Sequence, residues 1–515
     1  MRSFYPILFT LGWMVYVYTN GINVYYLDWR YMLEAMGLGV LYWIPWIVWS
    51  ERWGKRKWLF LVFCLHIGML FGKDLVKALL PDMQFDGWLY AHRWVLFMGA
   101  MGLGAIGAVW VLRRMRWSDR IAQVLNVSFT ILLALVLRRL GDIWPDIRRG
   151  APAAEAAADG SHLPNIFHIC LDMHMGAEFL AKIHQYDAEP FYRKLEALGF
   201  WTDRHSMSNY QATIPSFASM FQMQYLPDAP IGERAWMRML KRSATAIERL
   251  RAHGYRCIHT NLYNAIWSDA FHEATDRKTR RQVWETLLLP TAFNRLLPYR
   301  AHLRSLVQAH LDSIHQLIHA ARAYPPNGHY CFTHIVAPHP PFYFDQHSWN
   351  DFNHEMGRVE AFTHNDAHYA DPRARVWMAA QVRHTDALTL MAIREILAAY
   401  DEDHAPIILL HGDHGDFSLP ELPAPQWPTN ATEKEKAIFS NLYAIYLPKR
   451  YRSALPTPPG LVNTFRWLFN TLFNEQNPFL DSTQIAYDYN SQAFIPCGHW
   501  WKEPFQPSTE ITPAK

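Results

Sequence analysis

The first part of the chain alternates long apolar runs with short basic loops. The five apolar stretches are Tyr5–Leu27, Tyr31–Trp49, Trp58–Gly72, Trp94–Leu112 and Ile121–Leu137. A helix needs about 20 mainly apolar residues to cross a bilayer, and the first, second and fourth stretches come near that length. In a soluble helical bundle, so many long apolar helices would lack partners in water. The pattern therefore predicts an α-helical transmembrane domain of about five helices over residues 1–140.

Two basic loops set the expected orientation of this domain. They are "ERWGKRK" at Glu51–Lys57 and "RRMRWSDR" at Arg113–Arg120. Lys and Arg gather on the cytoplasmic side, so the N-terminus is predicted inside and the fifth stretch ends on the outer face. Arginines between residues 138 and 149 go against this topology, but the two loops and Arg2 outweigh them. The first stretch has no small-residue cleavage site, so no cleavable signal peptide is expected.

Beyond a predicted linker at 141–164, rich in Ala, Gly and Pro, short apolar runs alternate with helical patterns. The runs predict strands at Asn165–Asp172, Tyr255–Asn261, His329–Val336, Pro406–Asp413 and Leu442–Pro448. The helical patterns cover Ala188–Gly199, Ser243–Gly254, Ala374–Tyr400 and Leu461–Phe473. This alternation indicates an α/β domain with a mostly parallel sheet, predicted over 165–500 with a C-terminal tail at 501–515. Ligands bind beyond the carboxyl ends of such strands, where Asp172, His339, Asp413 and His414 fall.

Charge and cysteine content narrow the range of functions only slightly. The formal net charge is +3, which gives no argument for a nucleic-acid partner. Four of the 5 cysteines fall in the predicted outer domain, where disulfides persist. Two of these four lie in strand-like runs, so buried free thiols are an equal alternative. No cysteine or histidine spacing typical of a zinc finger is present.

The segment "NYQATIPSFASM" at Asn209–Met220 places Thr213 just before a helical pattern. One interpretation is structural, because Thr is a good N-cap and Ser216 can help the helix to start. The other is chemical, because a helix N-terminus suits a phosphate or sulfate group. A hydroxyl held there and bound to a metal would be an activated nucleophile. Both interpretations stay open from this segment alone.

Two further segments carry histidines at strand ends. In "LLHGDHGDFS" at Leu409–Ser418, an imidazole beside a carboxylate suits zinc or manganese better than calcium. Its glycines are expected to let the backbone turn sharply, so that neighbouring side chains converge. In "HIVAPHPPF", prolines stiffen the turn that holds His339, which can bind a phosphoryl oxygen or protonate a leaving group. With 26 histidines in the chain, an exposed turn histidine is an equal alternative. Asp172, which ends a strand, can bind a cation or cap a turn.

Four segments, in this order, resemble the sulfatase-like branch of the alkaline phosphatase superfamily. They are "NIFHICLDMHMG", "TIPSFASM", "APHPPF" and "LLHGDHGDFS". The segments "QVRHTDALTLMAIREIL", "IFSNLYAIYLP" and "LVNTFRWLFN" extend the resemblance over Asn165–Asp481. Membrane helices before such a domain are similar to those of the lipoteichoic acid synthases and the phosphoethanolamine transferases of bacterial envelopes. The resemblance implies the alkaline-phosphatase-like α/β fold for the second domain.

The resemblance also implies a role for individual residues. Carried over by position, the metal ligands would be Asp172, Thr213, Asp413 and His414. Thr213 would also be the nucleophile. The substrate-binding residues would be His259, Trp267 and His339, and His339 would also assist catalysis. His411 and Asp416 would lie behind the ligands or face solvent, where either could orient a ligand.

Two departures from the sulfatases point to phosphoryl transfer. Sulfatases carry Cys or Ser at the nucleophile position and oxidise it to formylglycine. The first residue of "TIPSF" is Thr213, which cannot yield that aldehyde, so the resemblance favours a phosphothreonine. Sulfatases also have a second Asp after the first, where this chain has Met173, which favours one metal ion over a calcium-type cluster.

The sequence thus predicts a metal-dependent phosphotransferase in the bacterial cytoplasmic (inner) membrane, with its catalytic domain facing the periplasm or cell exterior. A phosphoethanolamine- or phosphoglycerol-like headgroup would move from a membrane phospholipid to a glycan or lipid acceptor, with one divalent ion, Zn or Mn, as cofactor. The oligomeric state stays open. One alternative is a hydrolase of phosphodiesters or phosphonates, with water as acceptor. The other is a non-catalytic envelope assembly protein, which the presence of all four ligand positions weighs against.

Overall fold

The fold comes from a computed structural model. It describes residues 3–20, 29–66, 107, 109–110, 113–114, 119–148, 163–226, 244–260, 273–274, 299–324, 327–340, 342, 372–416, 436–454, 460–488 and 493–498. The chain divides into two compact units. The first comprises Met1–Gly150 and Arg277–His302, and the second comprises Ala151–Asp276 and Leu303–Lys515. Most of the predicted linker and all of the predicted tail lie outside the described residues.

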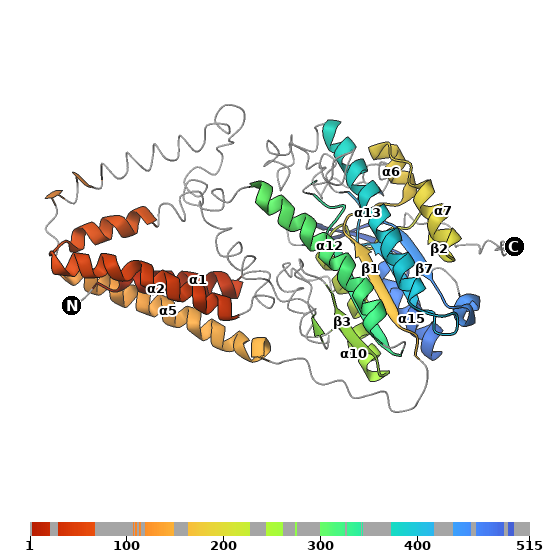
Figure 1. Ribbon diagram of the computed structural model, residues 1–515, viewed down its shortest axis with the longest axis horizontal. Helices are drawn as coiled ribbons and strands as arrows, with labels where there is room; N and C mark the ends of the chain where they lie inside the picture. Colours follow the sequence, from red (N-terminus) through yellow and green to blue (C-terminus); the bar gives the residue numbers. More distant parts are fainter. Residues whose placement is uncertain are drawn as a thin grey trace. The chain divides into compact units, whose positions relative to one another are not determined.

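The first unit contains α1 (Tyr5–Asn20), α2 (Trp29–Arg52) and α5 (Asp119–Arg148), with further helical residues at 56–66. α1 packs against both α2 and α5 (Figure 1). Aromatic rings fill the space between the helices, since Phe63 makes edge-to-face contacts with Tyr5 and Trp43. The Trp43 indole also donates to the Thr10 hydroxyl at 2.9 Å. Aromatic packing therefore holds this unit together.

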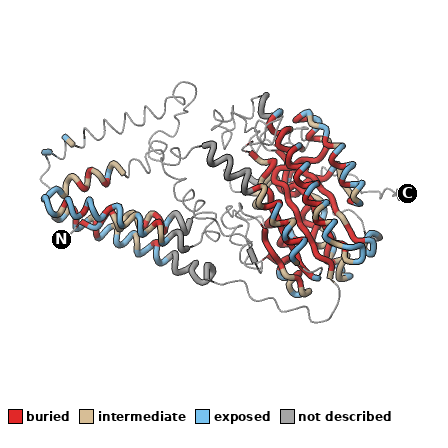
Figure 2. The backbone as a smooth tube through the Cα atoms, viewed as in Figure 1, coloured by how far each residue is buried: buried red, intermediate tan, exposed pale blue. Residues whose placement is uncertain are grey.

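Within the described residues, two helical segments are long and apolar enough to cross a membrane, Leu33–Arg52 and Arg120–Arg138. Only 22% and 17% of their most apolar windows are buried, and many of their large apolar residues are exposed. Figure 2 shows exposed positions along α2 and α5 in pale blue. A helix at the surface of a soluble protein keeps one face polar, so this exposure favours a lipid environment. These segments correspond to the second and fifth predicted spans. The first and third are described only in part, and the fourth lies almost entirely outside the described residues.

A seven-stranded sheet forms the centre of the second unit, in the order β2-β7-β6-β1-β5-β3-β4. The strands are β1 (Ile166–Leu171), β2 (Phe200–Asp203), β3 (Arg256–His259), β4 (Glu273–Ala274), β5 (His329–Ile335), β6 (Ile407–Gly412) and β7 (Tyr443–Tyr446). All neighbours pair in parallel except β7, which is antiparallel to both β6 and β2. The prediction of an α/β domain with a mostly parallel sheet is confirmed. All five predicted strands are present, with slightly shorter bounds.

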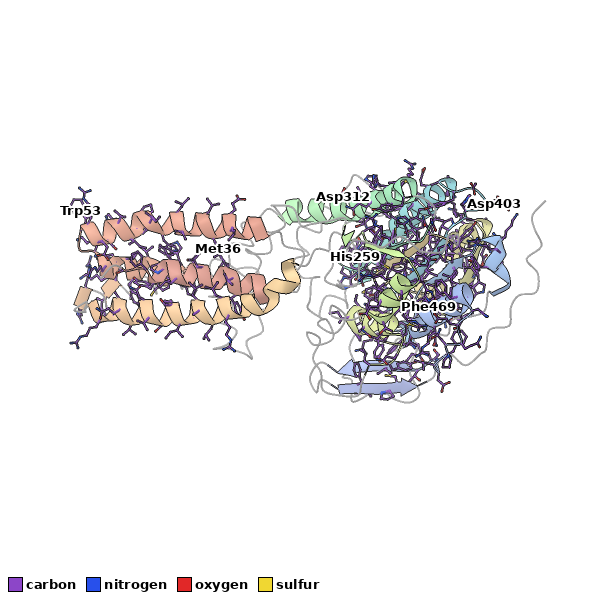
Figure 3. The ribbon with its side chains drawn as sticks, turned by 90° about the horizontal axis from the view of Figure 1, so that it is seen from below. Met36, Trp53, His259, Asp312, Asp403 and Phe469 are labelled. Atoms are coloured by element: carbon purple, nitrogen blue, oxygen red, sulfur yellow. The ribbon has the colours of Figure 1, made fainter. Side chains whose placement is uncertain are left out.

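Helices cover both faces of this sheet. They are α6 (Ala177–His184), α7 (Glu189–Ala197), α8 (Thr213–Gln222), α10 (Thr245–Ala252), α12 (Tyr299–Ala323), α13 (Pro372–Ala398) and α15 (Thr464–Phe473). α12 and α13 run across the near face of the sheet in Figure 1, and Arg322 of α12 pairs with Glu395 of α13. Short 3-10 turns lie at Lys449–Ala454 and Leu461–Asn463. A separate ribbon pairs β8 (Gln484–Asp488) with β9 (Ala493–Gly498) in antiparallel fashion (Figure 3).

A large hydrophobic core lies between the other face of the sheet and the helices α8, α10 and α15. Alternate residues of β1, Ile166 and Cys170, pack there with Phe217 and Phe221 of α8 and Phe465 of α15. This packing fixes α8 against the sheet, with its first residue beside the carboxyl ends of the strands. All 5 cysteines are free thiols, and the four in this unit are buried, so the disulfide alternative is wrong.

Candidate active site

The carboxyl ends of β1, β5 and β6 bring three potential metal ligands together. Leu171 of β1 lies opposite Ile335 of β5 and Gly412 of β6, so the residues around these positions share one edge. Ligand atoms of three buried side chains lie within 4.8 Å of one another there, those of Asp172, His334 and Asp413. The sequence placed both aspartates at this edge.

His414 and Thr213 complete the same cluster. The His414 Nε2 atom lies 3.2 Å from the Thr213 hydroxyl, 3.6 Å from Asp172 Oδ1 and 3.5 Å from Asp413 Oδ2. Its Nδ1 atom lies 2.7 Å from the carbonyl oxygen of Gly415, which can only accept a hydrogen bond. Nδ1 therefore carries a proton, and in the neutral ring Nε2 keeps a lone pair that faces the carboxylates. This tautomer is the one that a metal ligand requires.

The buried oxygen atoms of this cluster suit a divalent cation. Asp172 and Asp413 are 5% and 0% exposed. Asp172 Oδ1 and Asp413 Oδ2 accept no hydrogen bond from any residue that the structure describes. Burying such oxygens without a partner is costly, and a cation would remove that cost. Carboxylates combined with imidazoles match zinc or manganese, so the residues present fit the expected cofactor.

The charge of the Asp172 carboxyl group depends on its histidine neighbours. Burial, the largest influence, raises its pKa. The surrounding imidazoles, led by that of His339, together outweigh burial and hold the pKa below its usual value. The Asp172 side chain is therefore held ionised, as a metal ligand must be.

Thr213 is not the N-cap that one interpretation of the sequence expected. It is the first residue of α8, Ala212 precedes it at the cap position, and no side chain caps this helix. Ser216 instead donates to the Tyr210 carbonyl oxygen at 3.1 Å. The Thr213 hydroxyl thus lies at the helix N-terminus and contacts His414 rather than its own backbone. This geometry favours the chemical interpretation.

His339 is held in a rigid turn next to the cluster. Its backbone N–H donates to the Asp172 carbonyl oxygen at 3.1 Å, and its Nδ1 donates to the Pro340 carbonyl oxygen at 2.6 Å. From α13, the buried Gln381 amide donates to the carbonyl oxygens of Pro338 and His339 at 3.2 and 3.0 Å. The ring is half-buried rather than the exposed turn histidine of the alternative interpretation.

Besides His339, two residues were expected to bind substrate, and their outcomes differ. His259, which is labelled in Figure 3, is the last residue of β3 and is 1% exposed. Burial, aided by the nearby His334, lowers its pKa to about 3, so its imidazole is neutral. A substrate-binding role for His259 stays a prediction. Trp267 lies outside the described residues.

Sequence reasoning missed His334, which lies inside a strand. Its Nε2 atom is 3.4 Å from Asp172 Oδ2, and its ring contacts Phe217 edge to face. The quoted segment "HIVAPHPPF" begins with this residue, but a strand histidine gives no local signal for a ligand. Only the pairing of β5 with β1, which sets His334 beside Cys170, brings it to the site.

Other buried polar side chains support the loop after Asp172. His174 Nε2 lies 2.8 Å from Asp386 of α13, and Tyr186 donates to the same carboxylate at 3.1 Å. Asp416 is 1% exposed and lies 2.8 Å from His184 of α6. His411 is 1% exposed as well. Of the two predicted places for Asp416 and His411, behind the ligands or facing solvent, burial excludes the second. Burial of a polar side chain requires partners, which no local pattern reveals.

Close packing limits the two glycines of "HGDHG". Neither Gly412 nor Gly415 is among the glycines with positive φ. A Cβ atom on Gly412 would lie 2.2 Å from the His174 carbonyl oxygen, and one on Gly415 would lie 1.8 Å from that of Ala437. Close contacts rather than positive φ therefore require glycine at both positions, and the backbone bends between them at Asp413 and His414.

Gly415→Ala is expected to lower the free energy of unfolding by about 3 kcal/mol, because backbone atoms must move to admit the methyl group. Thermal unfolding followed by tryptophan fluorescence measures the change. Gly37→Ala, in α2, is the control, because a Cβ there meets nothing within 4 Å. Equal unfolding temperatures for the two variants would contradict this account of Gly415.

No family model matches the chain, and no curated protein matches it by sequence. Among solved structures, it is similar to the C-terminal periplasmic domain of EcEptC from Escherichia coli in complex with Zn. That match has a TM-score of 0.43 and 9% identity over 67% of this chain and 97% of the other. It is also similar to the integral membrane protein lipooligosaccharide phosphoethanolamine transferase A from Neisseria meningitidis, with a TM-score of 0.38 and 11% identity over 78% and 73% of the two chains.

A further neighbour is the lipoteichoic acid synthase LtaP from Listeria monocytogenes, with a TM-score of 0.37 and 11% identity over 67% of this chain and 84% of the other. These neighbours include both kinds of enzyme that the sequence motifs resemble. All three TM-scores lie below 0.5 and all three identities below 25%. The chemistry of this chain must therefore be argued from its own side chains.

Proposed function

We propose that the chain is a membrane-bound, metal-dependent phosphotransferase that moves the phosphorylated headgroup of a phospholipid to an envelope glycan or lipid. Thr213 is the nucleophile and carries the headgroup as a phosphothreonine. One observation carries the proposal: the Thr213 hydroxyl makes no capping bond and lies 3.2 Å from His414 Nε2, beside two buried carboxylates. The free N–H groups at the start of α8 favour a phosphoryl anion at this same point.

A divalent ion held by Asp172, Thr213, Asp413 and His414, with His334 beside them, would favour the ionised Thr213 oxygen and neutralise charge on the phosphoryl group. The Thr213 oxygen attacks phosphorus, and the bond from phosphorus to the diacylglycerol oxygen breaks. His339, close enough to influence the pKa of Asp172, donates the proton that this leaving oxygen takes up. An acceptor hydroxyl then attacks phosphorus, returns its proton to His339 and releases the Thr213 oxygen.

The outward-facing apolar side chains of α2 and α5 support a place in the bilayer that holds the lipid donor. We place the protein in the bacterial inner membrane, with the second unit on the outer side. Exchange of one phosphodiester for another requires no ATP, which suits a compartment outside the cytoplasm.

A transfer assay tests this function. The full chain is reconstituted with Zn²⁺ or Mn²⁺ in vesicles of headgroup-labelled phosphatidylethanolamine or phosphatidylglycerol, together with candidate glycan and lipid acceptors. We expect diacylglycerol and labelled acceptor in equal amounts. Water-soluble labelled headgroup phosphate would instead show a hydrolase, and the absence of diacylglycerol with every donor would contradict an enzymatic role.

A further inference from the structure

A chain of polar side chains crosses three strands behind the metal cluster. Tyr330 of β5, His168 of β1 and His411 of β6 all point to the face of the sheet that packs against α8 and α15. The Tyr330 hydroxyl lies 2.7 Å from His168 Nδ1, and His168 Nε2 lies 2.6 Å from His411 Nε2. His411 Nδ1 lies 3.0 Å from the carbonyl oxygen of Gly412. This row of hydrogen-bonded side chains therefore runs diagonally along the sheet and ends at Gly412, the residue before Asp413.

The chemistry of the bonded groups fixes the direction of every hydrogen bond in this row. The Gly412 carbonyl oxygen can only accept, so His411 Nδ1 carries a proton. In a neutral His411 ring, Nε2 then accepts, and His168 Nε2 must donate to it. His168 Nδ1 is left to accept from the Tyr330 hydroxyl. Both rings are 1% exposed or less, and burial lowers both histidine pKa values, that of His411 to about 4, which agrees with neutral rings.

The row of hydrogen bonds ends at the Gly412 carbonyl group, where it can set the position of the metal ligand Asp413. The Gly412 carbonyl oxygen belongs to the peptide that joins Gly412 to Asp413. A second donor, the Asn441 side-chain amide, binds the same oxygen at 2.8 Å, and Asn441 is itself held by Ser206 at 2.8 Å. Two donors on one carbonyl oxygen fix the plane of that peptide and hence the direction in which the Asp413 side chain leaves the backbone.

We infer that His168 and His411 are positioning residues for the metal centre, which hold Asp413 in the geometry of a ligand through the Gly412 carbonyl group. This inference rests on the metal centre of the proposed function. Groups that orient metal ligands typically change metal affinity by about 10-fold to 100-fold when they are removed.

Zinc affinity of the full chain, measured by competition with a chelating dye, tests this role without any substrate. His411→Phe keeps an aromatic ring but removes both hydrogen bonds, and should raise the zinc dissociation constant about 10-fold to 100-fold. His411→Asn keeps a donor near the Nδ1 position and should recover most of the affinity. Tyr443→Phe is the matched control, because it removes a buried hydrogen bond of 2.7 Å, to Thr464, on the same face of the sheet. It should lower stability and leave zinc affinity unchanged.

Imidazole nitrogen chemical shifts of the wild-type protein, assigned with the His411→Asn and His168→Gln variants, test the direction of these hydrogen bonds. We expect a proton on Nε2 of His168 and on Nδ1 of His411, with both rings neutral at pH 7. The opposite tautomers, or wild-type zinc affinity in His411→Phe, would overturn the inference. A wild-type chain that binds no zinc would overturn the metal centre and this inference together. One that binds zinc but transfers no headgroup would overturn only the proposed reaction.

Discussion

Thr213→Ala is expected to lower headgroup transfer by at least about 1,000-fold, because removal of a nucleophile leaves only the residual effect of binding. The fold should survive, since the Thr213 side chain makes no capping hydrogen bond in α8. Thr213→Ser keeps a hydroxyl at the same atom and should retain measurable transfer. Formation of diacylglycerol in phospholipid vesicles measures the activity of the wild type, Thr213→Ala and Thr213→Ser.

The matched control for this variant is Thr245→Ala. Thr245 is also the first residue of a helix, α10, and its hydroxyl donates to the Gln222 side chain at 2.9 Å. Its loss should leave transfer unchanged. Equal activity in Thr213→Ala and Thr245→Ala would remove Thr213 from the mechanism.

Asp413→Asn is expected to raise the metal dissociation constant more than about 100-fold, because a ligand contributes more than the groups that orient it. Transfer should fall with the metal content, which elemental analysis of the purified protein measures. The effects on stability should have opposite signs with and without metal. Without metal, the variant should be at least as stable as the wild type, because it buries one charge fewer beside Asp172. With metal at 100 times the wild-type dissociation constant, only the wild type should gain about 2.7 kcal/mol.

Asp403→Asn is the control, since Asp403 is an exposed residue, also labelled in Figure 3. It should bind metal as the wild type does. An Asp413→Asn protein with full metal content would show that the buried carboxylates of this edge do not hold the ion.

The sequence predicts best those strands that are buried on both faces of the sheet. β1 and β6 are buried along their whole length, so each reads as a mainly apolar run with one histidine. The aspartates that follow these runs could therefore be placed at one edge of the sheet. β2 has only four residues, three of them half-buried, and its sequence carries no comparable signal. Its pairing with β7 depends on contacts across about 240 residues of chain.

The parts of the site that escaped prediction depend on pairing and packing between strands. His334 lies within the buried strand β5, and only its register beside β1 makes it a neighbour of Asp172. The roles of Gly412 and Gly415 follow from backbone atoms of other segments, which a local pattern cannot show. The choice between a cap and a nucleophile for Thr213 likewise depended on the position of His414.

Mass spectrometry of the wild-type chain, quenched during turnover of a headgroup-labelled phospholipid, tests the central claim most directly. The account predicts that the peptide with Thr213 gains the mass of the phosphorylated headgroup, and that added acceptor removes it. A quenched enzyme that turns over lipid without this adduct, or that carries it on another residue, would contradict the account.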